Sequence, residues 1–145
     1  MSDSNIKDTP EEQNSELNSD SIAEIDGRLA TVLQVLPALG GTGGVERGTV
    51  EIAQSIVENG GRALVASAGG LLEHELKRVG AEHFTLPVDS KNPIVMWANV
   101  AKLADLIRQQ NVDLIHVRSR APAWSAYFAA RRTNCPFVTT FHGTY

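Results

Sequence analysis

The fold is decided by the stretch TVLQVLPALGGTGGVERGTVEIAQSIVEN, residues 31–59. Its first six residues form an apolar run rich in β-branched side chains, which is typical of a strand buried on both faces. Glycines then fill positions 40, 41, 43 and 44, in a turn where the positive end of a following helix could receive an anion. That helix is predicted because apolar residues from position 45 onward share one of its faces: Val45, Ile52, Ala53, Ile56 and Val57.

The glycine-rich turn matches neither of the two sharper nucleotide-binding motifs. Counting from Gly41 and Gly43, the third glycine of a dinucleotide fingerprint would fall on Glu46. A P-loop read from Gly43 to Gly48 continues with threonine and valine and so lacks the phosphate-binding lysine. The turn can therefore be a phosphate-binding site or only a tight connection between a strand and a helix.

Strand and helix patterns alternate along the rest of the chain. This alternation predicts right-handed βαβ units and an α/β fold, with a Rossmann-like parallel sheet flanked by helices. The expected strands after the first are 62–67, 83–87, 113–117 and 136–140. The expected helices after the first are 71–79, one that opens at 92–93, and one that carries Trp124, Tyr127 and Phe128.

The helix that opens at residues 92–93 has a clear start signal. Asn92 is a good N-cap and Pro93 suits the first helical position. Its buried stripe is expected to comprise Ile94, Trp97, Val100, Ala101, Ala104 and Ile107.

Composition and charge indicate an acidic N-terminal segment followed by one domain. Residues 1–26 hold eight acids and one base, whereas the remaining residues hold nine acids and twelve bases. We expect residues 1–28 to be disordered and residues 29–145 to form the domain. The mildly basic body would suit an anionic ligand, but it lacks the dense basic stripe of a nucleic-acid-binding protein. The single Cys135 fits a reducing cytoplasm, and no apolar run is long enough to span a bilayer.

Four loops that leave strands at their carboxyl ends carry unusual residues: 40–44, 68–70, 118–120 and 142–144. Ligands of parallel sheets bind outside the carboxyl ends of the strands. We therefore expect glycines, two arginines and a histidine to share one rim, suited to a substrate with phosphate or many hydroxyls.

His142 is the histidine with the best case for a functional role, because a strand end followed by Gly143 presents its imidazole at this rim. Arg118 and Arg120 can be ligand contacts or solvated surface charges. His116 lies within a strand pattern and reads as a core histidine with a hydrogen-bond partner, and His74 and His83 read as surface residues.

These residues carry a resemblance to family 4 glycosyltransferases, whose GT-B architecture has two Rossmann-like domains facing a cleft. The similar segments are VLP at 35–37 with GGVER at 43–47, DLIH at 113–116 with RSR at 118–120, and PFVTTFHG at 136–143. The resemblance covers about residues 30–145 and identifies this region as a partial N-terminal domain.

The resemblance implies transfer of a sugar, such as a hexose, from a nucleotide diphosphate sugar to a glycan or lipid-linked acceptor. It implies retention at the anomeric carbon, no metal cofactor, and a cytoplasmic role in glycan biosynthesis, with peripheral membrane association of the full-length protein left open. His142 would face the reacting sugar, Gly43 and Gly44 would contact the donor, and residues Arg118, Ser119 and Arg120 would line the acceptor side.

The resemblance also implies a limit, because most donor contacts of this family come from a second domain that the 145 residues lack. We therefore expect the 145 residues alone to show little or no transferase activity. Two alternatives remain: a nucleotide-sugar epimerase of GT-B shape, and a non-catalytic module that binds a glycan or a nucleotide.

Overall fold

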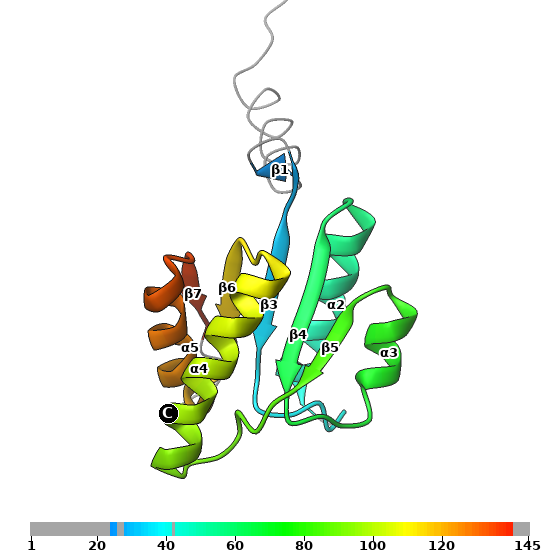
Figure 1. Cartoon of the computed structure of the whole chain (residues 1–145). Helices are drawn as coiled ribbons and strands as arrows, with labels where there is room; N and C mark the ends of the chain where they lie inside the picture. Colours follow the sequence, from blue (N-terminus) through cyan, green and yellow to red (C-terminus); the bar gives the residue numbers. More distant parts are fainter. Residues whose placement is uncertain (1–23, 26–27, 42, 141–145) are drawn as a thin grey trace, which may run out of the picture.

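The structure is a computed structural model, and it describes residues 24–25, 28–41 and 43–140. In this part of the chain, a parallel sheet has the strand order β5-β4-β3-β6-β7 (Figure 1). Its strands are β3 (Thr31–Val35), β4 (Arg62–Ser67), β5 (Glu82–Thr85), β6 (Leu114–Val117) and β7 (Phe137–Thr139). The predicted α/β fold with a Rossmann-like parallel sheet is confirmed.

The first strand of the sheet in sequence, β3, is also its central strand. Val35 is in register with Ala66 of β4 on one side and with Val117 of β6 on the other. The chain builds β4 and β5 outward on the first side, then crosses back to lay β6 against β3. The carboxyl ends of β3 and β6 therefore flank the topological switch point, where open α/β sheets bind their ligands.

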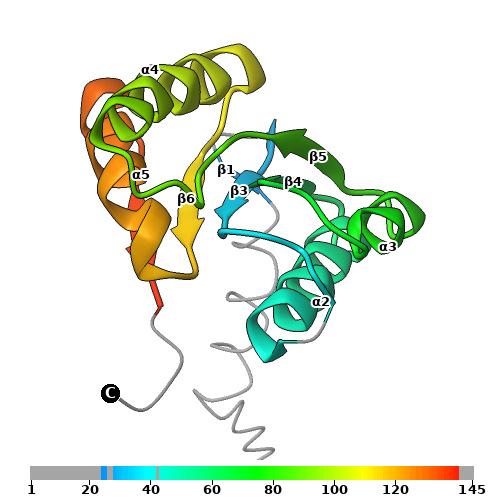
Figure 2. The ribbon, with the colours of Figure 1, turned by 90° about the horizontal axis from the view of Figure 1, so that it is seen from below.

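Helices cover both faces of the sheet (Figure 2). One face carries α2 (Gly44–Glu58) and α3 (Glu73–Arg78), and the other carries α4 (Pro93–Gln110) and α5 (Arg120–Thr133). Each face buries its own apolar cluster, one around Leu36 and Leu76 and one around Leu33 and Leu103. These two layers hold the strands rigidly, so the loops at the carboxyl edge begin from fixed positions.

The start of α4 and the ends of α4 and α5 follow from local sequence. The Asn92 side chain accepts a hydrogen bond of 2.9 Å from the Ile94 N–H, and Pro93 follows as the first helical residue, as predicted. At the other ends, Asn111 and Asn134 take the left-handed conformation that stops α4 and α5, each with φ of 53°.

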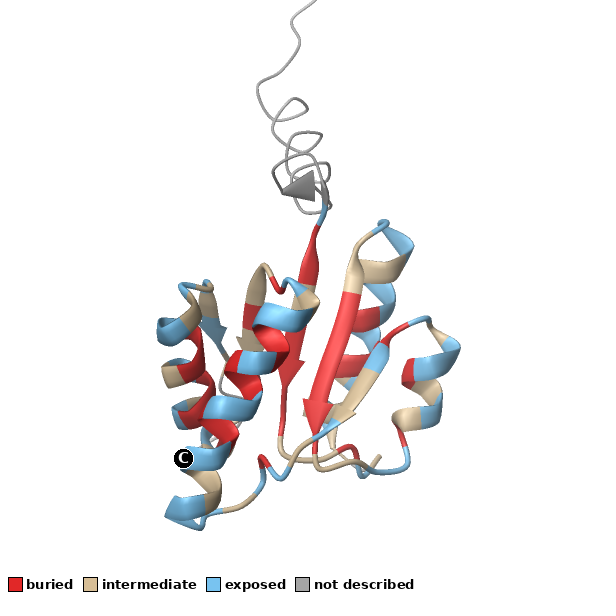
Figure 3. Cartoon of the chain, viewed as in Figure 1, coloured by how far each residue is buried: buried red, intermediate tan, exposed pale blue. Residues whose placement is uncertain are grey.

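The predicted buried stripe of α4 is wrong in its first half. Ile94 is 79% exposed and Trp97 is 52% exposed, whereas Val100, Ala104 and Ile107 are buried. The first turns of α4 extend past the carboxyl edge of the sheet, so they have no strand beneath them (Figures 1 and 3). Farther along the helix, Ala101 is also exposed and Leu103 is buried in its place.

The buried face of α2 is also rotated from the prediction. Ala53 is fully buried as expected, but Thr49 and Val50 are buried as well, and Val45 and Ile52 are only partly covered. Figure 3 shows this helix with its inner face against the sheet and its outer face exposed.

Ahead of the sheet, β1 (Glu24–Ile25) and β2 (Arg28–Leu29) form a short antiparallel pair that the sequence patterns did not indicate. The segment predicted to be disordered is residues 1–28, of which residues 1–23 and 26–27 lie outside the described residues. None of the helices in the described part of the chain is both long and apolar enough to cross a membrane.

Candidate functional site

The described loops predicted to share a rim do so. The carboxyl ends of the parallel strands meet at one edge, which gathers the glycine-rich turn, residues 68–70 and residues 118–120 (Figure 2). The fourth predicted segment, which holds His142, lies outside the described residues.

The glycine-rich turn is organised by an acidic side chain. The Glu46 carboxylate, in the first turn of α2, accepts hydrogen bonds from the N–H groups of Gly41 at 3.0 Å and Gly43 at 2.9 Å. Two donors that would otherwise point at an anion are therefore already satisfied by the protein itself. Gly44, the first residue of α2, is exposed, and open space surrounds the place where a Cβ would stand.

A second glycine loop, residues 68–70, is hydrogen-bonded to the loop that follows β3. The Leu39 N–H donates to the Gly69 carbonyl at 2.9 Å, and the Leu72 N–H donates to the Leu39 carbonyl at 3.1 Å. Gly70 has a positive φ of 151°, and a Cβ at this position would overlap the Leu39 carbonyl oxygen. The two loops are thus a single hydrogen-bonded unit that only glycine at position 70 permits.

His83 holds the second loop and is not the surface residue that was predicted. Only 6% of its side chain is exposed, and its Nε2 lies 2.7 Å from the hydroxyl of the buried Ser67. Its Nδ1 lies 3.8 Å from the Glu73 carboxylate, which accepts the Gly70 N–H at 3.1 Å. Burial lowers the pKa of His83, and the charge of Glu73 opposes that shift in part.

Arg118 departs from its neighbours in the 118–120 loop. It is only 6% exposed, and its guanidinium lies at the switch point, 3.5 Å from the side-chain oxygen of Gln34 in β3. Gln34 in turn donates to the Thr49 carbonyl of α2 at 3.1 Å. Burial lowers the pKa of Arg118, but a guanidinium still carries its positive charge at neutral pH. The reading of Arg118 as a solvated surface charge is therefore wrong.

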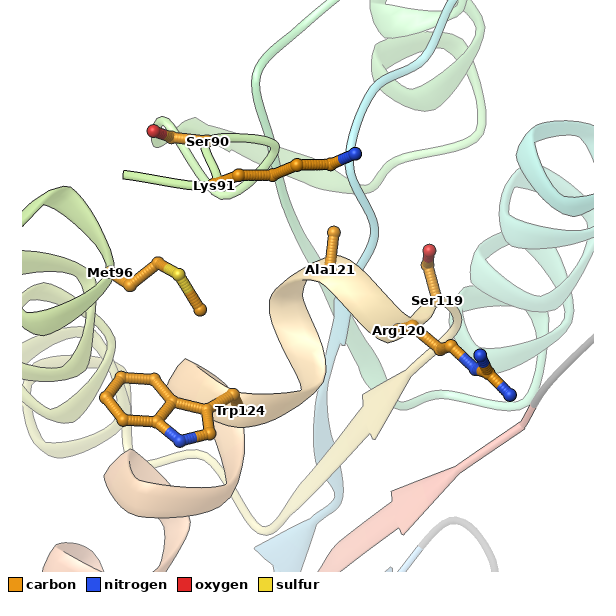
Figure 4. Close-up of a pocket in the computed structure, with 7 residues that line it drawn as sticks. All are labelled: Ser90, Lys91, Met96, Ser119, Arg120, Ala121 and Trp124. Carbon is orange, nitrogen blue, oxygen red and sulfur yellow. The ribbon is translucent and has the colours of Figure 1, made fainter. Parts of the chain in front are cut away.

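Ser119 and Arg120 line a pocket of about 600 Å³ at the same edge (Figure 4). Arg118 does not belong to this lining. The remaining lining residues were not predicted as site residues and come from the β5–α4 loop, α4 and α5: Ser90, Lys91, Met96, Ala121 and Trp124. The loop position of Lys91, after a strand end, was the signal that could have suggested it.

One other predicted assignment concerns a residue away from this pocket. His116 is half-buried, and its Nε2 lies 3.1 Å from the Thr140 hydroxyl, which agrees with a core histidine that has a partner. In the part of the chain that the structure describes, no three histidine, cysteine or acidic side chains are grouped so as to hold a metal ion.

The family model for Glycosyltransferase Family 4 matches residues 42–145, which is most of the chain. The chain belongs to Glycosyltransferase Family 4. No curated protein sequence matches it significantly. The match includes α2, Arg118 and the pocket residues.

Solved structures agree with this membership. The crystal structure of a glycosyltransferase from Rickettsia africae ESF-5 is similar at 45% identity with a TM-score of 0.73, over 80% of this chain and 30% of that one. Acinetobacter baumannii MurG is similar at 15% identity with a TM-score of 0.62, over 79% of this chain and 37% of that one. A UDP-N-acetylglucosamine 2-epimerase is similar at 10% identity with a TM-score of 0.51, over 76% of this chain and 32% of that one. The last two likenesses concern the fold alone, and the chain spans about a third of each protein's length.

Proposed function

We propose that this chain is the acceptor-side domain of a retaining glycosyltransferase that takes its sugar from a nucleotide diphosphate sugar. The observation that carries the proposal is the carboxyl edge itself, in a chain of this family. There the glycine-rich turn, the buried guanidinium of Arg118 and an open pocket lie around one switch point. Charge, space and exposed backbone thus converge at the position where α/β sheets bind their ligands.

Each residue has a specific part in this proposal. Gly43 and Gly44 contact the donor: the Cβ position of Gly44 is surrounded by open space, and the Glu46 carboxylate beside Gly43 gives up the Gly43 N–H to the donor. Arg118 stands between donor and acceptor, where its buried positive charge is little screened by water. Ser119 and Arg120 contact the acceptor in the pocket that they line.

His142 is the catalytic residue of the proposal, on the resemblance of its segment to the family pattern. Its imidazole would form a hydrogen bond with a hydroxyl of the reacting sugar or stabilise the positive charge that develops on that sugar. The reaction would proceed without a metal ion, as in most enzymes with this architecture, so we expect EDTA to leave the rate unchanged.

The chain covers 30% of the Rickettsia africae glycosyltransferase. We therefore propose that the 145 residues alone catalyse little or no transfer, and that the missing donor contacts come from a second domain. An epimerase would instead release a changed nucleotide sugar without an acceptor, and a binding module would release nothing.

The test uses the whole gene product that contains this chain. It is incubated with a panel of UDP- and GDP-sugars with and without candidate acceptors, and nucleoside diphosphate release is measured. We expect release that needs an acceptor, that falls by at least about 100-fold in His142→Ala, and that is unchanged in the control His74→Ala. Acceptor-independent isomerisation of the nucleotide sugar, or unaltered release by His142→Ala, would contradict the proposal.

A further inference from the structure

We propose that the pocket beside Trp124 binds an amphiphilic acceptor, with an anionic phosphate head and an apolar chain, of the kind found in lipid-linked glycan acceptors. This inference rests on the proposed function and names the substrate class of its acceptor site. The pocket volume of about 600 Å³ is within the usual range for sites that enclose a small ligand.

The pocket has a cationic side and an apolar side. Figure 4 shows Met96 and Trp124 on one side and the Lys91 amine across from them, whereas the Arg120 side chain extends away from them toward α2. Lys91 is exposed at the end of its loop, and Arg120 begins α5. The Lys91 ammonium at the pocket favours a negatively charged group such as a phosphate, and the Arg120 guanidinium adds positive charge on the side of α2.

The chemistry of the lining argues against a neutral glycan as the occupant. Such a ligand presents many hydroxyls, which proteins usually meet with carboxylates and amides. The described lining residues include neither a carboxylate nor an amide side chain, and offer only the hydroxyls of Ser90 and Ser119. The apolar surface of Met96 and Trp124 suits a hydrocarbon chain better.

An exposed aromatic strip continues the apolar side of the pocket outward. Trp124 is 37% exposed and meets the exposed Trp97 of α4 edge-to-face, with ring centroids 5.0 Å apart. Ile94 lies one turn earlier on α4 and is 79% exposed. Exposed apolar side chains that adjoin one another mark surfaces that bind something apolar, whereas isolated ones carry no such meaning.

The arrangement also fixes the direction in which the acceptor lies. In Figure 4 the cationic side chains are directed toward α2 and the loop after β3, whereas Met96 and Trp124 lie beside α4. The anionic head would therefore point to the switch point, where the donor sugar is expected, and the apolar chain would leave over Trp97. This is the orientation that presents a head group for glycosylation and leaves the chain outside.

The two tryptophans allow this binding to be tested directly. The chain has two tryptophans in total, and both belong to the proposed site, so intrinsic fluorescence reports on it. The 145-residue chain is titrated with octyl phosphate below its critical micelle concentration, and with inorganic phosphate and octyl glucoside as separate ligands. We expect octyl phosphate to bind at least about 10-fold more tightly than either of the others, because only it carries both parts.

Charge variants separate the head-group contact from general adhesion to an apolar face. Lys91→Gln should weaken octyl phosphate binding by about 10-fold, and Met96→Gln should weaken it without altering the response to inorganic phosphate. Lys77→Gln is the matched control, because Lys77 is an exposed lysine on α3 at the far end of the sheet. Circular dichroism of each variant checks that it folds as the wild type does.

Several outcomes would overturn the proposal. Equal binding of octyl glucoside and octyl phosphate would mean that the face is merely apolar, and the same holds if Lys91→Gln has no effect. Binding to anionic vesicles without binding of octyl phosphate would assign the strip to a membrane surface. If the chain forms dimers and octyl phosphate dissociates them, the proposal holds only when Lys91→Gln abolishes this dissociation. Dimers that octyl phosphate does not dissociate would mean that the strip binds a second copy of the chain.

The binding test and the transferase test fail independently. Octyl phosphate binding is measured in a chain that is expected to be inactive, so it requires no turnover. Binding without acceptor-dependent release by the whole gene product would reject the proposed function and leave an amphiphile-binding site. Acceptor-dependent release without octyl phosphate binding would keep the transferase and reject this acceptor class.

Discussion

The guanidinium of Arg118 lies against Gly48. A Cβ built on Gly48, in the second turn of α2, would stand 2.9 Å from Nη2 of Arg118. A real side chain at that position would have to displace the guanidinium from its buried place beside Gln34. The Arg118 guanidinium therefore has space at the switch point because Gly48 of α2 carries no side chain.

Replacing Gly48 should disturb this arrangement. We expect Gly48→Val to lower the free energy of unfolding by about 2 kcal/mol, because the added methyl groups crowd a buried guanidinium. The matched control is Gly44→Val in the same helix, where no atom lies within 4 Å of the Cβ position, and it should cost less than about 1 kcal/mol. Urea unfolding followed by circular dichroism gives both values, and equal values for the two variants would contradict this account.

The contact between the two glycine loops predicts a larger effect at Gly70. Gly70→Ala should lower the free energy of unfolding by about 3 kcal/mol, because the new Cβ meets the Leu39 carbonyl and the backbone has a positive φ of 151°. Gly40→Ala is the control, because the nearest atom to its Cβ position is 4.0 Å away. Thermal unfolding of both variants measures the difference, and a Gly70→Ala protein as stable as Gly40→Ala would show that the loops are not joined in this way.

The burial of His83 predicts a pH dependence of stability. Its pKa is lowered by burial in the folded state, so the folded chain resists a proton that the unfolded chain accepts below a pH of about 6.5. Stability should therefore be highest above that pH, and it should fall as the pH decreases from about 6.5 toward the folded-state pKa.

His83→Gln should flatten this part of the pH profile, since glutamine does not titrate. His74→Gln is the matched control, because it replaces a histidine that is exposed on α3. The measurement is the free energy of unfolding from urea titrations at several pH values between 5 and 7.5. A wild-type profile that rises as the pH falls through this window would show that His83 gains rather than loses from its surroundings.

Cys135 should be a slow nucleophile in the folded chain. Burial first, and then the charge of Asp113, raise the pKa of this thiol to about 11, and its Sγ donates a weak hydrogen bond to the Val112 carbonyl at 3.5 Å. Because the thiolate is the reactive form, alkylation by iodoacetamide at pH 8 should be about 100-fold slower in the folded chain than in denaturant. Similar rates in the two states would mean that this thiol is accessible and ionised.

Much of the architecture followed from periodicity. The alternation of strand and helix patterns predicted the parallel sheet, and Asn92 marked the start of α4, because both signals are local. The run at residues 31–36 was interpreted as an apolar strand, but it contains the polar side chain of Gln34, which is fully buried. Its partners come from α2 and from the loop after β6, which no local pattern reveals.

The site was less accessible to sequence reasoning for the same reason. Ser119 and Arg120 were placed at the correct edge by their position after a strand, but Arg118 turns inward because Gly48 leaves room for it. The exposure of Trp97 depends on how far α4 extends beyond the sheet, a length that helical spacing does not encode. His83 appeared to belong to the surface because its partners, Ser67 and Glu73, belong to other elements.

The measurement that tests the proposed function most directly is the stereochemistry of the transfer reaction. The whole gene product containing this chain is mixed with a nucleotide diphosphate sugar and an acceptor, and the anomeric proton of the product is followed by NMR. The account predicts a glycosylated acceptor with the same anomeric configuration as the donor, formed together with nucleoside diphosphate and absent when the acceptor is omitted. An inverted product, or an isomerised nucleotide sugar without transfer, would contradict it.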